Sequence, residues 1–187
     1  MNKNQINAFY KNLIYPDKDK FIKEAKEIQR EIDFSSITKG PVLVIGDFKT
    51  KPLYFLFCIY FSKNERRILN YINLTATTWH QNQFKNIEEK NYNFQDKVLF
   101  GDITFIKFGI SEKIKPYLQQ LVLNVIEERE TNNRRTVVYV DSKYVTYSKI
   151  KKLKSHFKDN NYSIIDVKEK RKTSGRKKPK RKEQDKK

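Results

Sequence analysis

Hydrophobic residues recur along this chain with two periods, one typical of helices and one of buried strands. Phe21, Ala25, Ile28 and Ile32 are spaced by four, three and four positions, which predicts a helix that begins after Asp17. Further helices are predicted at 53–61, which is apolar on every side, and at 79–89, 116–131 and 150–157. Short apolar runs at 42–45, 68–74, 103–108, 136–140 and 162–167 predict strands.

Helices and strands alternate over the whole of 18–167. This alternation predicts an α/β domain in which a mostly parallel sheet of about five strands carries helices on both faces. Ligands of such sheets bind beyond the carboxyl ends of the strands, so we expect the chemistry in the loops after Ile45, Phe108 and Val140. Residues 1–17 form a short N-terminal segment, and 168–187 have no residue suited to a core, so we expect a disordered tail there.

Positive charge is concentrated at the end of the chain. The formal net charge is +18, and half of it lies in the last 20 residues, which hold 12 basic and 3 acidic side chains. Such a run binds polyanions by counterion release, with little regard to sequence, so we expect it to bind nucleic acid, with DNA as the first candidate. The basic residues concerned are Lys168, Lys170, Arg171, Lys172, Arg176, Lys177, Lys178, Lys180, Arg181, Lys182, Lys186 and Lys187. The basic helix at 150–157 either extends this surface or is an ordinary solvated face.

The sequence does not favour a reactive thiol, a metal site or a membrane-spanning helix. Cys58 lies in the apolar run 53–61 and is predicted to be a buried, inert thiol. His80 and His156 lie in different segments, with no partner at metal-ligand spacing, so we expect no metal and no cofactor. The longest apolar run has nine residues, and a membrane helix needs about 20. We therefore expect a cytoplasmic protein without membrane contact.

One strand–loop–helix segment has the setting of a phosphate-binding loop. In GPVLVIGDFKTKPLYFL a predicted strand ends at Gly46 and a helix follows, and ITFIKFGI, PYLQQLVLNVIEER and RRTVVYVDS continue the alternation. Over residues 18–167 this series resembles the AAA+ module of bacterial replicative-helicase loaders, the DnaC/DnaI/IstB-like group. The resemblance implies a P-loop NTPase (AAA+)-like fold and a role in DNA replication.

The order and spacing of three further positions carry the resemblance. In that family a strand ends in Asp-Asp-x-Gly, a helix then ends in Arg, and a Thr-led strand ends in Ser-Asn. Counted along this chain without a gap, these positions fall on Gly109, Arg129 and Thr136.

The loop itself departs from the pattern of a working nucleotide site. Such a loop reads G-x-x-x-x-G-K-[ST], in which the Lys contacts the β/γ-phosphates and the Ser/Thr holds Mg²⁺. Counted from Gly46, the second Gly is Lys51, the Lys is Pro52 and the Ser/Thr is Leu53. Pro52 lacks a backbone donor and Leu53 cannot bind magnesium. Lys49 and Lys51 can touch an anion only from other positions.

The acidic and sensor positions have changed as well. The paired Asp positions of the family fall on Ile106 and Lys107, and the sensor Asn position falls on Asp141, whose charge would face phosphate. Asp102, at the other end of that strand, is too distant to substitute. The arginine-finger region reads HFKDNNY and contains no Arg. Because phosphoryl transfer depends on positioning and charge stabilisation, we expect that hydrolysis is lost and that no residue is catalytic.

These features predict an ATPase-inactive relative of the helicase loaders that acts in DNA replication or in a mobile genetic element. It would bind nucleic acid through the tail and a replicative helicase, a polymerase or a helicase loader through the folded part, either as an adaptor or as a decoy. Two alternatives stay open. One is a general basic DNA- or RNA-binding protein whose core presents the tail, and the other is an atypical ATPase that uses Lys49 or Lys51.

Overall fold

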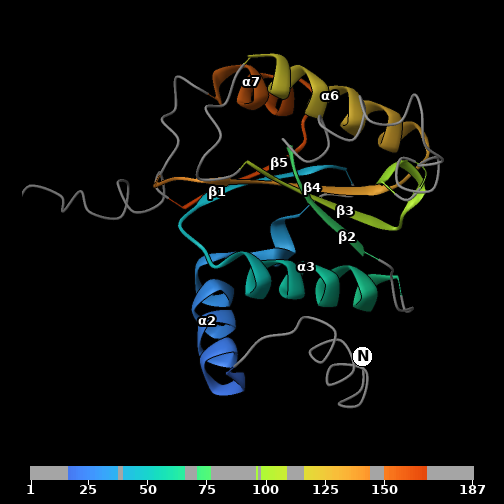
Figure 1. Ribbon diagram of the computed structural model, residues 1–187. Helices are drawn as coiled ribbons and strands as arrows, with labels where there is room; N and C mark the ends of the chain where they lie inside the picture. Colours follow the sequence, from blue (N-terminus) through green and yellow to red (C-terminus); the bar gives the residue numbers. More distant parts are fainter. Residues whose placement is uncertain are drawn as a thin grey trace, which may run out of the picture.

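A parallel five-stranded sheet forms the centre of the computed structural model, which describes residues 17–37, 40–65, 71–76, 96, 98–108, 116–143 and 150–167. The strands are β1 (Val42–Gly46), β2 (Tyr71–Thr75), β3 (Ile103–Phe108), β4 (Arg135–Asp141) and β5 (Ser163–Asp166). Their order is β2-β3-β4-β1-β5, and every neighbouring pair is parallel (Figure 1). The expected sheet of about five parallel strands is confirmed.

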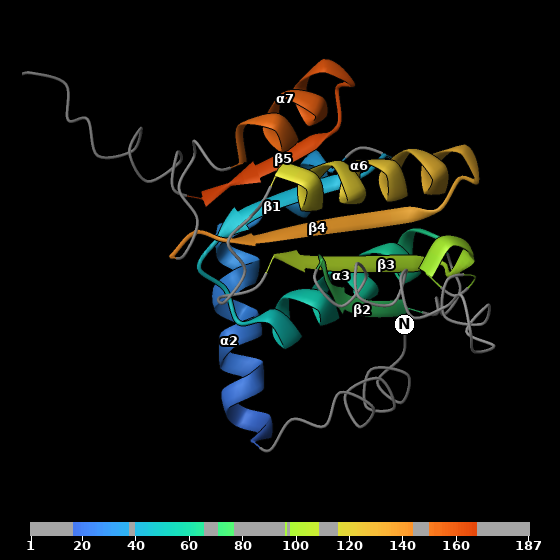
Figure 2. The ribbon, with the colours of Figure 1, turned by 45° about the horizontal axis from the view of Figure 1, so that its top comes forward.

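Helices cover both faces of the sheet, as expected. Figures 1 and 2 show α2 (Lys18–Glu31) and α3 (Thr50–Asn64) on one face and α6 (Pro116–Thr131) and α7 (Lys151–Asp159) on the other. Successive side chains of a strand point to opposite faces, so Val42 and Val44 pack with α2 and α3, whereas Leu43 and Ile45 pack with α6 and α7. Strands buried on both faces explain why the sequence shows continuous apolar runs there.

Helix α2 forms as its apolar spacing predicts. The side chain of Asp17 accepts a hydrogen bond from the amide of Lys20 at 2.9 Å and so caps the helix. Phe21, Ala25 and Ile28 are buried against the core. A single turn of 3-10 helix, η1 (Phe34–Ser36), follows and was not predicted.

Helix α3 begins earlier than the sequence suggested. The predicted strand and helix left residues 47–52 between them, but the loop comprises only 47–49, because Thr50 already starts the helix. Pro52 lies in the first turn, where its missing N–H leaves no helical bond unmade. The amide of Leu53 makes the first helical bond, to the carbonyl of Lys49 at 3.2 Å. The predicted burial of the helix is confirmed, and Cys58 is 1% exposed.

The end of α6 is fastened to the sheet by Arg129. Its side chain is fully buried, although its neighbours Glu127, Glu128 and Glu130 are exposed. Its guanidinium donates to the hydroxyl of Thr136 and to the carbonyl of Arg135, at the start of β4. It also donates to three carbonyls in the segment before β3, those of Val98, Leu99 and Gly101. The family positions occupied by Arg129 and Thr136 are therefore in direct contact.

Several sequence predictions fall outside the described residues. These are the segment 1–16, the helix at 79–89 with His80, the first part of the strand at 68–74, Gly109 and the tail 168–187. Within the part of the chain that the structure describes, no helix has the length and apolar character needed to cross a membrane.

Candidate functional site

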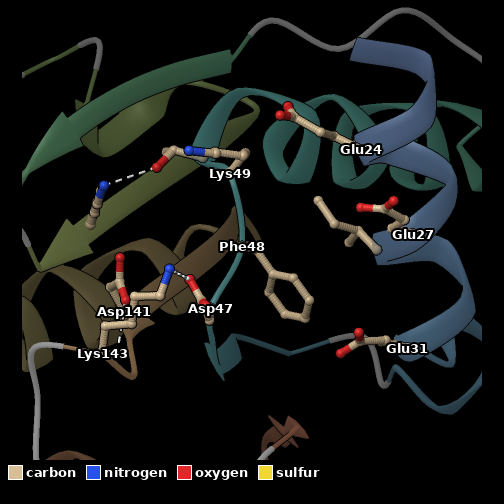
Figure 3. A pocket seen from close by; sticks show the side chains of 11 residues that line it. Glu24, Glu27, Glu31, Asp47, Phe48, Lys49, Asp141 and Lys143 are labelled. Carbon is tan, nitrogen blue, oxygen red and sulfur yellow. Dashed lines mark hydrogen bonds and ion pairs between the residues drawn. The ribbon is translucent and has the colours of Figure 1, made fainter. Parts of the chain in front are cut away.

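A pocket of about 380 Å³ lies at the carboxyl edge of the sheet, between α2 and the loop that follows β1. This is the edge where the loops after β1, β3 and β4 were expected to carry the chemistry, and Figure 3 shows the pocket from close by. Its lining is made up of Glu24, Glu27, Ile28, Glu31, Asp47, Phe48, Lys49, Thr50, Lys107, Asp141 and Lys143.

The loop after β1 is held closed by Tyr139, which projects from β4. The Phe48 amide donates to the Tyr139 hydroxyl at 2.9 Å, and that hydroxyl lies 2.8 Å from the Phe48 carbonyl oxygen, to which it donates. Burial raises the pKa of Tyr139 above its ordinary value, although the bond to Phe48 opposes the shift, so the phenol stays a neutral donor near pH 7. One of the loop amides that a phosphate would need is therefore bonded to a side chain of the protein.

Gly46 makes room for an aromatic ring. A Cβ at Gly46 would lie 2.5 Å from Cε2 of Phe48 and 2.9 Å from its Cδ2, closer than real contacts allow. The ring therefore folds back over the end of β1. In a working loop a glycine at this position lets the backbone approach phosphate, whereas here the same space is filled by the side chain two residues later.

Lys107 lies where the family has a carboxylate. Its ammonium donates to Oγ1 of Thr50, in the first turn of α3, at 2.9 Å, and it lies 5.8 Å from the centre of the Tyr139 ring. These contacts fix a positive charge beside the start of α3. A metal ion would have to overcome the repulsion of this ammonium at short range.

The turn after β4 closes the other side of the pocket. The carboxylate of Asp141 accepts the amide of Lys143 at 3.0 Å, and the ammonium of Lys143 forms a 2.8 Å ion pair with Asp47 (Figure 3). The amide of Ser142 donates to the carbonyl of Gly46 at 2.8 Å. Asp141, at the sensor position, thus stabilises the turn that follows β4 by bonding the backbone of that turn.

The structure brings together only part of the predicted site. Lys49, Lys107 and Asp141 line the pocket. Lys51 is exposed on α3 and takes no part in the lining. Ile106 is buried on the face of the sheet that α6 and α7 cover, away from the pocket. Two further loop positions, Pro52 and Leu53, are buried in α3. The twelve basic residues of the predicted tail surface lie outside the described residues.

The residues present do not fit Mg·ATP. The lining holds five carboxylates and three ammonium groups, so it is formally negative, whereas a triphosphate requires positive charge. Figure 3 shows Glu24, Glu27 and Glu31 directed from α2 toward the loop. Among the described residues, no group of three or more His, Cys, Asp or Glu residues is placed to hold a metal ion.

The residues that close the loop were not predicted from the sequence. From the sequence, Tyr139 was predicted only to belong to the strand at 136–140, and Phe48 and Thr50 only to lie between the strand that ends at Gly46 and the helix at 53–61. A signal was present, because a tyrosine in a strand buried on both faces needs a hydrogen-bond partner for its hydroxyl. The three carboxylates of α2 were also missed, since nothing in a single helix tells which element faces it.

The other reactive or charged residues considered from the sequence, Cys58, His156 and Lys154, pack or pair within the folded domain. Burial raises the pKa of the Cys58 thiol above its ordinary value, in agreement with the predicted inert thiol. His156 is packed against Phe157 and Tyr162, with its Nδ1 4.0 Å from a carboxylate oxygen of Glu127. Lys154 of the basic helix is buried and paired with Asp166 at 3.1 Å, so it cannot extend a surface that binds nucleic acid.

The strand order and the loop between β1 and α3 define the class of fold. Five parallel strands in the order β2-β3-β4-β1-β5, with a glycine-ended β1 leading into a helix, form a P-loop NTPase (AAA+)-like α/β domain.

Comparisons with known proteins found similarity only to solved structures of low sequence identity. No family model matches the chain, and no curated protein matches it. One similar solved structure is the DnaC helicase loader, with 9% sequence identity and a TM-score of 0.45 over 81% of this chain and 90% of that chain. Another is DnaI, with 12% identity and a TM-score of 0.46 over 82% of this chain and 86% of that chain. A third is AMPPCP-bound DnaA from Aquifex aeolicus, with 12% sequence identity and a TM-score of 0.46 over 83% of this chain but only 51% of that chain. All three TM-scores lie below 0.5, so the fold assignment rests on the strand order and register.

Proposed function

We propose that this protein is an accessory factor of DNA replication, or of a mobile genetic element, that keeps the P-loop architecture without hydrolysing ATP. It binds nucleic acid through the basic residues of 168–187 and a replication protein through its folded part. The observation that carries the loss of hydrolysis is the bond between the Tyr139 hydroxyl and the Phe48 backbone, which consumes a loop amide.

Charge supports the same proposal. Lys107 supplies an ammonium 2.9 Å from Oγ1 of Thr50, at a strand position where the helicase-loader pattern has a carboxylate. The carboxylates of α2 face the loop and repel phosphate. Without a nucleotide that binds and leaves, the domain has no chemical switch, and a scaffold or decoy needs none. The link to replication comes from the ordered series that resembles the helicase loaders.

The first test is nucleotide binding. A ligand that binds the folded state stabilises it by RT ln(1 + [L]/Kd), so we expect millimolar Mg·ATP to leave the melting temperature of the full chain unchanged. The rate of ATP hydrolysis with the protein present should equal the background rate measured without it. Turnover that disappears on Lys49→Ala or Lys51→Ala would instead support the atypical ATPase.

The second test concerns nucleic acid and the protein partner. A full-length variant with Gln at all 12 basic positions of 168–187 should bind DNA more weakly and with a smaller salt dependence, because counterion release is lost. The same variant should still capture a replicative helicase, a polymerase or a helicase loader. Retained DNA affinity would contradict the role of the tail, and failure to capture any of the three would favour the general nucleic-acid-binding protein.

A further inference from the structure

Helix α2 carries charges of opposite sign on two of its sides. With about 3.6 residues per turn, Glu24, Glu27 and Glu31 share the side that faces the pocket (Figure 3). The same geometry puts Lys23, Lys26 and Arg30 together on the side opposite the buried Phe21, Ala25 and Ile28. We call these three cations the α2 basic stripe.

The cations of the α2 basic stripe are exposed and form no ion pairs with described residues, although Asp19 lies one turn before Lys23 on the same side of the helix. All three side chains are exposed, and none forms an ion pair or hydrogen bond with another residue that the structure describes. Lys23 and Glu27 have the spacing at which helical ion pairs form, yet no ion pair joins them. A row of three free cations therefore faces solvent.

The dimensions of the stripe suit a nucleic-acid backbone. Seven residues separate Lys23 from Arg30, which corresponds to about 10 Å along the helix. Phosphates of one strand of B-DNA follow each other about every 3.4 Å along the axis and wind around it, so the stripe is long enough to face more than one phosphate.

The position of the stripe also suits a ligand shared with the basic tail. Figures 1 and 2 both show α2 below the carboxyl ends of the strands, on the side of the molecule where β5 ends at Asp166. Residues 168–187, with their 12 basic side chains, follow directly after that strand in the sequence. One polyanion can therefore meet both sets of charges.

We infer that the α2 basic stripe is a second phosphate-binding surface, by which the folded domain itself contacts the backbone of a nucleic acid. The inference rests on the proposed function, since it concerns the same ligand as the tail. The contact is independent of base sequence, because its three side chains reach phosphates and not base edges.

The test compares two full-length variants with the same change of charge. In Lys23→Gln/Lys26→Gln/Arg30→Gln the stripe is neutralised. In Lys151→Gln/Lys152→Gln/Lys158→Gln the same number of exposed cations is removed from α7, on the other face of the sheet. Affinity for a DNA duplex is measured over a range of salt concentrations, and circular dichroism confirms that both variants melt like the wild type.

We expect the slope of log K against log salt to become less negative by about 2 to 3 in the α2 variant, because each phosphate contact contributes about −0.9. The α7 variant should leave the slope close to that of the wild type. Equal losses in both variants would mean that only net charge matters, and an unchanged slope in the α2 variant would mean no contact, so either result overturns the inference. In both cases the wild type still binds DNA, whereas a wild type that fails to bind overturns the proposed function as well.

Discussion

The hydroxyl of Tyr139 is hydrogen-bonded to both the amide and the carbonyl of Phe48, at 2.9 and 2.8 Å, across 91 positions of sequence. Tyr139 lies on β4, which is the neighbour of β1 in the sheet. The bonds therefore tie the loop after β1 to the adjacent strand by a side chain of the domain. The conformation of the loop follows from packing and hydrogen bonds within the protein and requires no bound phosphate.

The first prediction concerns this link. Tyr139→Phe keeps the ring but leaves the amide and the carbonyl of Phe48 without their partner, and an unsatisfied buried group costs about 1–3 kcal/mol. Because the bonds to Phe48 are only partly buried, we expect the free energy of unfolding to fall by about 1 kcal/mol, the lower end of this range. We also expect the Phe48 amide to exchange faster with deuterium. Urea denaturation and hydrogen-exchange mass spectrometry measure the two effects.

Tyr54 offers a matched control for that substitution. It is buried in the same core, and its hydroxyl has no hydrogen-bond partner among the described residues. Tyr54→Phe removes an unsatisfied polar atom, so it should be neutral or stabilising. Equal losses of stability in the two variants would contradict a specific role for the Tyr139 hydroxyl.

The second prediction concerns Gly46. In Gly46→Ala the new methyl group meets the Phe48 ring at 2.5 Å, so the ring must move. Because the ring is only partly buried, we expect a cost of about 1 kcal/mol, the lower end of the range for overpacking. Denaturant unfolding of the single variant measures this cost.

A second substitution tests the stated cause. In a Phe48→Ala background the ring is absent, so Gly46→Ala should destabilise much less than it does in the wild type. If Gly46→Ala costs the same in both backgrounds, the glycine is required for a reason other than the ring.

The sequence predicted the fold better than the site, and the reason is physical. The strands at 42–45 and 103–108 and the helix at 116–131 follow from local periodicity, which the chain carries in neighbouring residues. The loop after β1 was judged against a motif instead. That motif showed which groups are missing, but it could not show what fills their place.

The filling groups come from elements far apart in the sequence. Tyr139 and Lys107 reach the loop only because β3, β4 and β1 are neighbours in the sheet. Likewise, Lys154 belongs to a basic run, yet it is buried because Asp166 of β5 lies beside it. Pairings of this kind depend on tertiary structure, which local patterns do not encode.

The third prediction concerns Arg129. Its guanidinium satisfies the Thr136 hydroxyl and several carbonyls in a site closed to water, so Arg129→Met should lower the free energy of unfolding by at least about 3 kcal/mol. Arg134→Met is the control, because the side chain of Arg134 is 37% exposed and its ion pair with Asp102 lies at 3.3 Å. We expect the control to lose less than about 1 kcal/mol. Similar losses in the two variants would contradict the fastening role of Arg129.

The fourth prediction concerns alkaline pH. Burial raises the pKa of Tyr54 and of Tyr139 above the ordinary value, whereas burial lowers the pKa of Arg129 to about 10. Each tyrosine contributes stability that is complete below the unfolded pKa of about 10 and is lost above it, because only the unfolded chain releases its proton there. Arg129 acts in the opposite sense, since the folded state loses its proton first.

The pKa values of Tyr162 and of the Cys58 thiol are raised as well. These four groups outweigh Arg129, so the net effect is a loss of stability as pH rises above about 9 to 10. Tyr54→Phe removes one of these groups without removing a hydrogen bond to a described residue. The free energy of unfolding of this variant should therefore decline less steeply with pH, by up to about 1.4 kcal/mol per pH unit. Urea denaturation from about pH 8 to about pH 11 measures both slopes, and parallel curves for variant and wild type would show that the Tyr54 phenol titrates alike in the folded and unfolded chains.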